Sequence, residues 1–190
     1  VVASQNGCPG PAATYVVDIH NKPVADFGNT TVCVGNTTTF QDLSTITGSP
    51  SGITAWNWNF NDPLSQGNNI SQDQNPTHDF TAAGTYNVQL IIESANGCRD
   101  TVNESVIVNP LPQVDFNFDD VCDGTTMVFT DASTSGSPIT NWSWNFGSGQ
   151  TSTQQNPTNL FPGPGLYNVT LTVINANGCT NSRTKTVIVF

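Results

Sequence analysis

The stretch that decides the fold is five residues long and occurs twice, as Trp56-Asn57-Trp58-Asn59-Phe60 and as Trp142-Ser143-Trp144-Asn145-Phe146. Large aromatic residues alternate with small polar ones, which is the period-two pattern of a half-buried β-strand. Each ring buries on the order of 150–250 Å², so one strand can supply much of a small domain's core. The alternative is an exposed row of tryptophans that stacks on sugars. Since all four tryptophans lie in these two strands and each copy needs a core, we expect burial.

The rest of the chain repeats around these two strands, which predicts two domains, at residues 23–110 and 111–190. The spacing between equivalent residues shrinks in only two places, both within predicted loops, where insertions are tolerated. The connecting sequence Asn109-Pro110-Leu111-Pro112 carries two prolines and is expected to be semi-rigid.

Residues 1–22 are predicted to be the C-terminal strands of a preceding repeat. The tripeptide Asn6-Gly7-Cys8 matches Asn96-Gly97-Cys98 and Asn177-Gly178-Cys179. Because these strands lack their partners, we expect the sequence to be part of a longer tandem array.

Each repeat is predicted to be all-β, with about seven strands and no helix, as in an immunoglobulin-like β-sandwich. Short β-prone runs separated by Gly, Pro, Asn and Ser support this fold. The expected elements of the first repeat are an edge strand at 24–27, a hairpin of 31–34 with 37–42, a strand at 56–60, a short strand within 61–75, and strands at 86–92 and 101–108.

The charge of the chain bounds its partners. The formal net charge is −10 with only four Lys and Arg, so nucleic acid would be repelled. No run approaches the ~18–20 apolar residues of a membrane span, so membrane insertion is not expected.

Catalytic motifs are absent from the sequence, and no enzyme activity is expected. There is no nucleophile elbow, HExxH motif or phosphate loop. A catalytic histidine needs a nucleophile and an orienting carboxylate, and nothing near His20 or His78 in the sequence supplies them. No cofactor is expected. Asp119, Asp120 and Asp123 form an acidic cluster that calcium could use, but a solvated loop is favoured because the first repeat lacks it.

Several motifs resemble the polycystic-kidney-disease (PKD) domain. They are Asp42-x-Ser44, Trp58-x-Phe60, Asn75-Pro76-Thr77 and Gly84-x-Tyr86-x-Val88, and the second repeat carries the same set. Both repeats depart from the family pattern where Asn59 and Asn145 replace an aspartate, and His78 becomes Asn159. The Asn-Gly-Cys hairpin and the Val-Cys strand resemble long surface proteins of Bacteroidetes.

This resemblance implies a non-catalytic structural or adhesive repeat of an extracellular bacterial surface protein or fibre. The partners would be other repeats of the same protein, with surface proteins or glycans as further candidates. The alternatives are an accessory spacer pair of a secreted hydrolase and a weak glycan-binding module.

The predicted core centres on six aromatic residues. Tyr86 and Tyr167 each follow a glycine by two residues at the start of a core strand, like the tyrosine corner of immunoglobulin-like domains, so their hydroxyls should bond a nearby backbone group. The six are Trp58, Phe60, Tyr86, Trp144, Phe146 and Tyr167.

The five cysteines indicate an oxidising compartment. Pairing within each domain would join Cys33 to Cys98 and Cys122 to Cys179. In a sandwich with two strands between Phe60 and Phe80, however, Cys33 and Cys98 lie at opposite ends, on the order of 25 Å apart, too far for a disulfide. We therefore favour an inter-domain bridge from Cys33 to Cys179, with Cys8, Cys98 and Cys122 paired to other repeats. A single strand in that interval would restore the pairs within domains.

Overall fold

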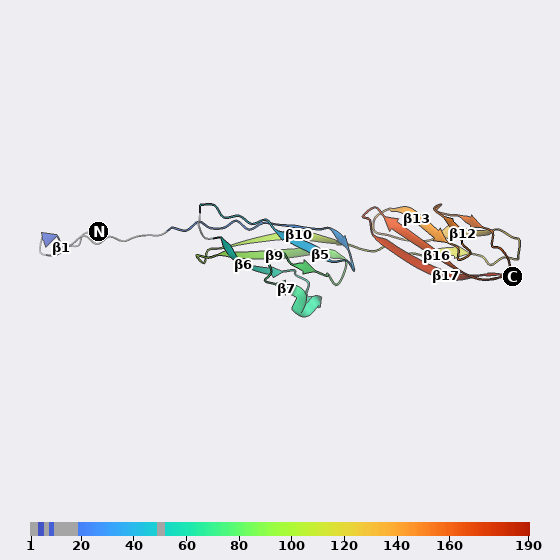
Figure 1. Ribbon diagram of the computed structural model, residues 1–190, viewed down its shortest axis with the longest axis horizontal. Coiled ribbons are helices and arrows are strands. Elements are labelled where there is room, and N and C mark those ends of the chain that lie inside the picture. The colour runs from blue at the N-terminus through green and yellow to red at the C-terminus, as the bar shows by residue number, and fades with distance from the viewer. Residues whose placement is uncertain (1–3, 6–7, 10–18, 49–51) are drawn as a thin grey trace.

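The computed structural model describes residues 4–5, 8–9, 19–48 and 52–190. Within these ranges the chain forms two β-sandwiches that lie end to end (Figure 1), domain 1 with strands β3–β10 and domain 2 with strands β11–β17. Ahead of them, β1 (Ser4–Gln5) pairs antiparallel with β2 (Cys8–Pro9). The other predicted features of residues 1–18 lie outside the described residues.

Domain 1 packs a five-stranded sheet, ordered β4-β10-β9-β6-β7, on a three-stranded sheet, ordered β3-β5-β8. Its strands are β3 (Phe27–Asn29), β4 (Val32–Cys33), β5 (Thr38–Asp42), β6 (Ile53–Asn59), β7 (Ile70–Ser71), β8 (Thr77–His78), β9 (Gly84–Ser94) and β10 (Arg99–Asn109).

Domain 2 repeats this arrangement with sheets ordered β14-β13-β16-β17 and β11-β12-β15. A lone parallel bridge between Val121 and Val189 stands where β4 pairs with β10 in domain 1. The strands are β11 (Phe116–Phe118), β12 (Met127–Asp131), β13 (Ile139–Asn145), β14 (Thr151–Ser152), β15 (Thr158–Asn159), β16 (Gly165–Asn175) and β17 (Thr180–Val189). The prediction of two all-β, immunoglobulin-like sandwiches is confirmed.

The core of each domain lies between its two sheets and is built around the tryptophan strand. Trp58 of β6 pairs with Leu90 of β9, and Trp144 of β13 pairs with Leu171 of β16. Because side chains alternate along a strand, every second residue of these strands faces the opposite sheet. The buried cluster of domain 2 comprises Val114, Phe116, Met127, Phe129, Trp144, Phe146, Phe161, Val169, Leu171, Val173, Val187 and Val189.

The predicted hairpin of 31–34 with 37–42 is wrong. Strand β4 runs parallel to β10 in the larger sheet, with Val32 opposite Val108, whereas β5 stays in the smaller sheet between β3 and β8. The chain changes sheets between β3 and β4. This crossing gives the end of β10 a partner, which an exposed sheet edge otherwise lacks.

Two other expectations for domain 1 need correction. The edge strand predicted at 24–27 lies at Phe27–Asn29, while Val24 makes only an isolated bridge to Thr45. A short 3-10 helix, η1 (Pro63–Asn69), occupies a stretch where no helix was expected. Proline suits a first helical turn because its missing N–H has no partner there.

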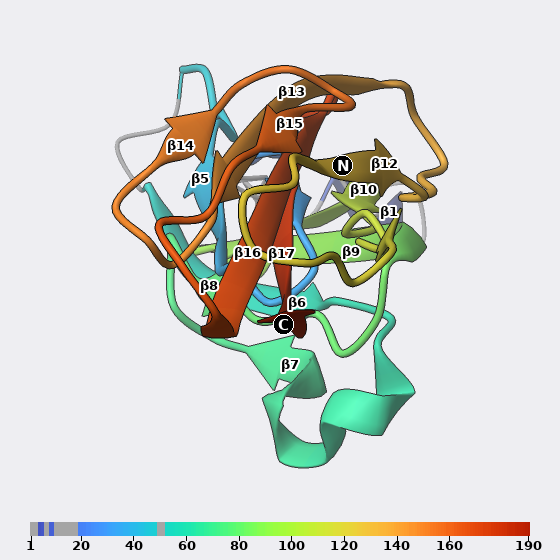
Figure 2. The ribbon, with the colours of Figure 1, turned by 90° about the vertical axis from the view of Figure 1, so that its right-hand side faces the viewer.

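Helix η1 stands out from the side of domain 1 (Figure 2). It is an insertion in the β6–β7 connection, closed by a hydrogen bond from Phe60 N to Asn69 O of 2.9 Å. Domain 2 closes the same connection from Phe146 N to Gln150 O, at 3.1 Å, with a much shorter loop. In the described ranges no helix is both long and apolar enough to cross a membrane.

Candidate functional site at the domain junction

The end of domain 1 that faces domain 2 is formed by β4 and the last residue of β10. Cys33 lies beside Asn109 in the parallel pair of strands. The backbone then turns back, with Val34 N donating to Asn109 O at 2.9 Å and Asn36 N to Cys33 O at 3.0 Å. Gly35 sits at the tip with φ of +89°, a conformation that glycine adopts without steric cost. This turn presents Cys33 to the next domain.

The facing end of domain 2 is the hairpin between β16 and β17. Asn175 is buried, and its Oδ1 accepts hydrogen bonds from Asn177 N at 3.1 Å and Cys179 N at 3.0 Å. Gly178 has φ of +77°, as a tight hairpin turn requires. The buried amide therefore shapes the turn and fixes where Cys179 emerges.

A disulfide between Cys33 and Cys179 joins these two ends, with the Cα atoms 5.6 Å apart. The side-chain amide of Asn177 adds a hydrogen bond of 2.9 Å to Asn109 Oδ1. Cys33 is 8% exposed and Cys179 is fully buried. The junction thus has a covalent bond and a polar contact in addition to the peptide linker.

Cys98 and Cys122 form no disulfide within the described part of the chain. Cys98 is partly exposed and Cys122 is exposed. Cys98 directly precedes β10, whereas Cys33 lies beside the last residue of that strand, so Cys98 and Cys33 lie at opposite ends of domain 1. The side chain of Cys8, also expected to pair elsewhere, lies outside the described residues.

The aromatic residues predicted for the core lie between the sheets. Trp58, Phe60, Trp144 and Phe146 are each 2% exposed or less. The two indole N–H groups donate to backbone carbonyls, Trp58 to Asp73 and Trp144 to Gln154, at 2.9 Å each. These rings are therefore not a platform for sugars.

The two tyrosines are partly buried against the same cores. The Tyr86 hydroxyl donates to Ala82 O and the Tyr167 hydroxyl to Gly163 O, both at 2.8 Å. Each bond holds the backbone four residues upstream, at the corner that leads into β9 in domain 1 and into β16 in domain 2.

An aspartate anchors the outer tryptophan of each pair, which the sequence analysis missed. Asp42 Oδ2 accepts from Trp56 Nε1 at 2.7 Å, and Asp131 Oδ2 accepts from Trp142 Nε1 at the same distance. The Asp-x-Ser motif was visible in both repeats, but its partner tryptophan lies on another sheet. The motif therefore links the two sheets.

These aspartates are held in the charged form. Burial alone would raise the pKa of Asp42, but hydrogen bonds from Ser44, Gln74 and Trp56 outweigh it and hold the pKa below its usual value. The same balance of burial and hydrogen bonds lowers the pKa of Asp131.

His78 has a carboxylate partner that lies 16 residues away in the sequence. His78 Nε2 lies 3.2 Å from Asp62 Oδ2, and both side chains are almost fully buried. Asp62 also accepts from Thr81 N at 2.9 Å and from the Thr81 hydroxyl at 2.7 Å. Burial alone would raise the pKa of Asp62, but the hydrogen bonds from Thr81 and the contact with His78 outweigh burial and hold the pKa below its usual value. The sequence hid this pair because η1 separates its members.

This buried pair is a packing feature of domain 1. The His78 ring stacks on Phe60 with centroids 4.3 Å apart, and its side chain is only 2% exposed. In domain 2 Asn159 takes the place of His78, and its Nδ2 has no hydrogen-bond partner.

The acidic cluster of domain 2 is engaged with its own backbone. Asp120 Oδ1 accepts from Ile188 N at 2.9 Å, and Asp123 Oδ1 accepts from Gly124 N at 3.0 Å. Over residues 19–48 and 52–190, no group of three or more His, Cys, Asp and Glu side chains is placed to hold a metal ion. The cluster thus shapes the end of domain 2.

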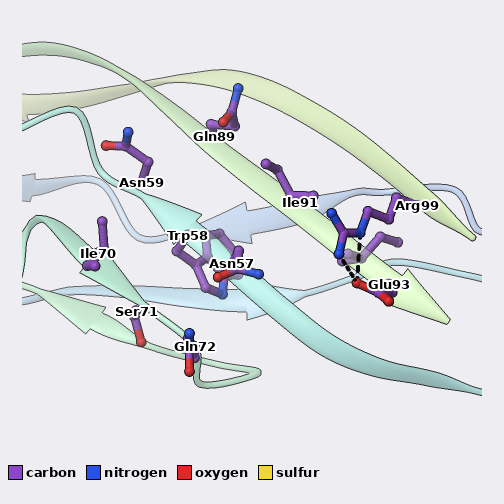
Figure 3. Close-up of a pocket in the computed structure, with 11 residues that line it drawn as sticks. Asn57, Trp58, Asn59, Ile70, Ser71, Gln72, Gln89, Ile91, Glu93 and Arg99 are labelled. Atoms are coloured by element: carbon purple, nitrogen blue, oxygen red, sulfur yellow. Dashed lines mark hydrogen bonds and ion pairs between the residues drawn. The ribbon is translucent and has the colours of Figure 1, made fainter. Parts of the chain in front are cut away.

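A pocket of about 290 Å³ lies on the larger sheet of domain 1, lined from β6, β7, β9 and β10 (Figure 3). Its lining is mostly amide and aliphatic, with one ion pair between Arg99 and Glu93 at 2.6 Å. Trp58 contributes to the lining but is only 2% exposed. Without an exposed ring, the pocket lacks the stacking surface expected of a sugar site.

Two immunoglobulin-like β-sandwiches in tandem, with a covalent bridge at their junction, place this chain among multidomain β-sandwich proteins. More narrowly, the chain belongs to the PKD domain family, whose sequence profile matches residues 20–108 and 109–189.

Curated relatives include proteases. The chain is 27% identical over 144 residues to the pre-pro-metalloprotease PrtV of Vibrio cholerae, covering 74% of this chain and 15% of that protein. It is 44% identical over 46 residues to a microbial collagenase of Vibrio alginolyticus, covering 24% of this chain and 6% of that protein. The chain thus spans only a small part of either relative.

A solved structure with a similar fold is the PKD1 domain of Vibrio anguillarum Epp. It is 30% identical to this chain, covers 43% of this chain and 95% of that domain, and has a TM-score of 0.40.

Proposed function

We propose that this chain is a non-catalytic, load-bearing spacer of an extracellular protein, in which the Cys33–Cys179 bond locks two PKD domains into one rod segment. The observation that carries the proposal is the position of that bond. It joins the end of domain 1 that faces domain 2 to the facing hairpin of domain 2, beside a linker that already contains two prolines.

The bond changes the path of a pulling force. When the two ends of the chain are pulled apart, tension passes along the backbone to Cys33, across the sulfurs to Cys179, and out. The backbone between the two cysteines, with a sequence separation of 146, carries none of it. Strand β3, which precedes Cys33, and strand β17, which follows Cys179, still carry load, so the bond limits how far the chain can extend.

The setting proposed for this spacer is outside the cell. Disulfides persist in oxidising compartments, and the net charge of −10 favours solubility of an extended polymer. We place the chain in an adhesive fibre or surface protein of a bacterium, where a stiff segment holds a binding tip away from the cell.

A second candidate is an accessory spacer pair of a secreted hydrolase. The match to a pre-pro-metalloprotease over most of this chain supports it. The mechanics would be the same, and the two settings differ in what lies elsewhere in the full protein. Sequencing the complete gene separates them, since a hydrolase domain favours the accessory role and many further repeats favour the fibre.

Single-molecule force spectroscopy tests the spacer proposal. When the oxidised chain is pulled by its ends, the segment between the two cysteines should not extend. The Cys33→Ser, Cys179→Ser double variant should release about 500 Å more contour length on unfolding. Cys98→Ser is the matched control, because it removes a cysteine outside the bridge and should release no extra length. Equal release from the oxidised chain and the double variant would refute the proposal.

A further inference from the structure

Two cysteines outside the bridge occupy the same positions in the repeat as the two that form it. Cys98 follows an Asn-Gly turn as Cys179 does, and Cys122 follows a valine in the crossing segment as Cys33 does. Each domain therefore carries both cysteine-bearing parts of the junction, a Val-Cys turn and an Asn-Gly-Cys hairpin. Between domains 1 and 2, only the turn of domain 1 and the hairpin of domain 2 are joined.

The far end of domain 2 reproduces the backbone that presents Cys33. Asp123 N donates to Phe190 O at 2.8 Å, as Val34 N does to Asn109 O, and Thr125 N donates to Cys122 O at 3.1 Å. Gly124, with φ of +75°, holds the tip of the turn. The turn that carries Cys122 thus has the shape of the turn already seen to receive a hairpin.

The near end of domain 1 reproduces the hairpin that presents Cys179. Ser94 is buried, and its hydroxyl accepts from Cys98 N at 3.2 Å, in the place of the Asn175 amide. Ser94 N donates to Cys98 O and Gly97 N to Ser94 O, both at 2.9 Å. Gly97 has the same φ of +77° as its counterpart in domain 2. Cys98 therefore emerges in the same direction from its own domain.

The peptide entering domain 1 is held as the linker into domain 2 is held. Asn96 Nδ2 lies 3.1 Å from His20 Nδ1, which matches the bond from Asn177 to Asn109. His20 precedes Pro23 by the same interval that separates Asn109 from its second linker proline. In the observed junction, the residue in this position also binds the cysteine-bearing turn through its carbonyl. A domain leading into His20 would therefore bring its own turn to Cys98.

The bonded cysteines differ from the other two in solvent exposure. Cys33 and Cys179 are buried where the domains meet, whereas Cys98 is partly exposed and Cys122 is exposed. The backbone around Cys98 and Cys122 thus has the local structure of the junction but lacks the neighbouring domain that would cover these cysteines.

We infer that Cys98 and Cys122 form disulfides with neighbouring PKD domains, so that every junction of a longer array is bridged as the observed one is. The partner of Cys98 is the cysteine-bearing turn of a preceding domain, and the partner of Cys122 is the Asn-Gly-Cys hairpin of a following domain. This inference rests on the proposed function and names the partner of the spacer.

Each new bridge is a two-electron oxidation. Two thiols lose their protons and, together, two electrons as the sulfur–sulfur bond forms. Glutathione disulfide can accept them, being reduced to two glutathione thiols. The same chemistry accounts for the bridge already present.

The test adds a third domain to the full chain. A second copy of residues 20–108 is placed directly after Val189, so that the added His20 takes the position of Phe190. The purified protein is oxidised with glutathione disulfide, its remaining thiols are alkylated, and its disulfides are mapped by mass spectrometry without reduction. We expect a bond between Cys122 and the added Cys98, beside the bond between Cys33 and Cys179. Cys122→Ser is the control and should leave the added Cys98 alkylated.

The outcomes separate the two proposals. If Cys33 and Cys179 are bonded but Cys122 and the added Cys98 are both alkylated, the inference fails and the spacer stands. If neither pair forms, the spacer fails as well. A bond between the added Cys33 and the added Cys98 also overturns the inference. A second variant carries residues 109–190 as the added copy and should bond Cys122 to the added Cys179, so the result does not depend on one added domain folding.

Discussion

At the scale of single residues, one carboxylate in each domain joins the two sheets. Asp131 ends β12 in the smaller sheet, yet its side chain accepts hydrogen bonds from Trp142 in the larger one and from Ser133 in its own loop. Hydrogen bonds to a charged group are stronger than those to a neutral one. The negative charge of this carboxylate therefore helps to hold the two sheets together.

The first prediction concerns acid stability. Because the folded pKa of Asp131 is lowered, its stabilising contribution is present above the ordinary aspartate pKa of about 3.9 and is lost as pH falls through the folded pKa. Asp131→Asn should lower the free energy of unfolding at pH 7 by about 1–2 kcal/mol. Between pH 5 and pH 2, the free energy of unfolding should fall less in the variant than in the parent.

Urea unfolding at several pH values measures this. Asp123→Asn is the control, because its carboxylate bonds only the next residue's backbone. Parallel stability curves for the parent and Asp131→Asn would show that the carboxylate does not contribute as argued.

The second prediction concerns the core. Trp144 is fully buried at the centre of domain 2, so Trp144→Ala should destabilise that domain by about 3–5 kcal/mol. Leu160→Ala, at a side chain that is 50% exposed, is the control and should change stability by less than about 0.5 kcal/mol. Equal effects of the two substitutions, measured by denaturant unfolding, would contradict the assigned core.

At the scale of elements, the tryptophan strand is positioned by its neighbours on both sides. Strand β13 pairs with β16 along its length and with β14 at its end. The turn from β13 to β14 passes close to β16, at Gly147. This glycine lies where the second domain has the short connection and the first has η1.

The third prediction tests that close approach. Gly147 has φ of +73°, and a Cβ there would lie 2.7 Å from Asn168 O. Gly149 has φ of +87° with nothing within 4 Å of a Cβ, so Gly149→Ala carries only the backbone strain of about 1–2 kcal/mol. Gly147→Ala should cost about 1–3 kcal/mol more, because the turn must also move away from β16. Denaturant unfolding of the two variants gives the comparison, and equal losses would mean that the turn can shift freely.

At the scale of the whole molecule, the bridge makes one mechanical unit of two domains. Each sandwich has its own core and its own tyrosine corner. Without the disulfide, the peptide linker would be the only covalent connection between the two domains. The Cys33–Cys179 bond closes a loop that contains most of both domains. It therefore affects stability as well as extension.

The fourth prediction follows from this loop. A cross-link removes conformational entropy from the unfolded chain, and a sequence separation of 146 corresponds to about 5 kcal/mol in the chain-entropy treatment. The Cys33→Ser, Cys179→Ser double variant should lose up to that amount in calorimetry, whereas Cys98→Ser should be nearly neutral. A double variant as stable as the parent would show that the bond is not formed or does not constrain the unfolded chain.

Much of the fold follows from short-range patterns in the sequence. Alternation around Trp58 and Trp144 determines which faces of β6 and β13 are buried, because side chains along a strand point to opposite sides. The repeat itself defines the two domains, and the glycine before Tyr86 marks the corner.

Tertiary structure alone decided which distant groups meet. Strand β4 is two residues long, and only the free edge of β10 determines that it pairs there instead of with β5. Asp62 and His78 form a buried pair because η1 folds outward between them. For the cysteines, the sequence allowed pairing within or between domains. The bridge follows from the position of Cys33 at one end of domain 1, since a disulfide depends on the distance between two Cα atoms and the folded sheets determine that distance.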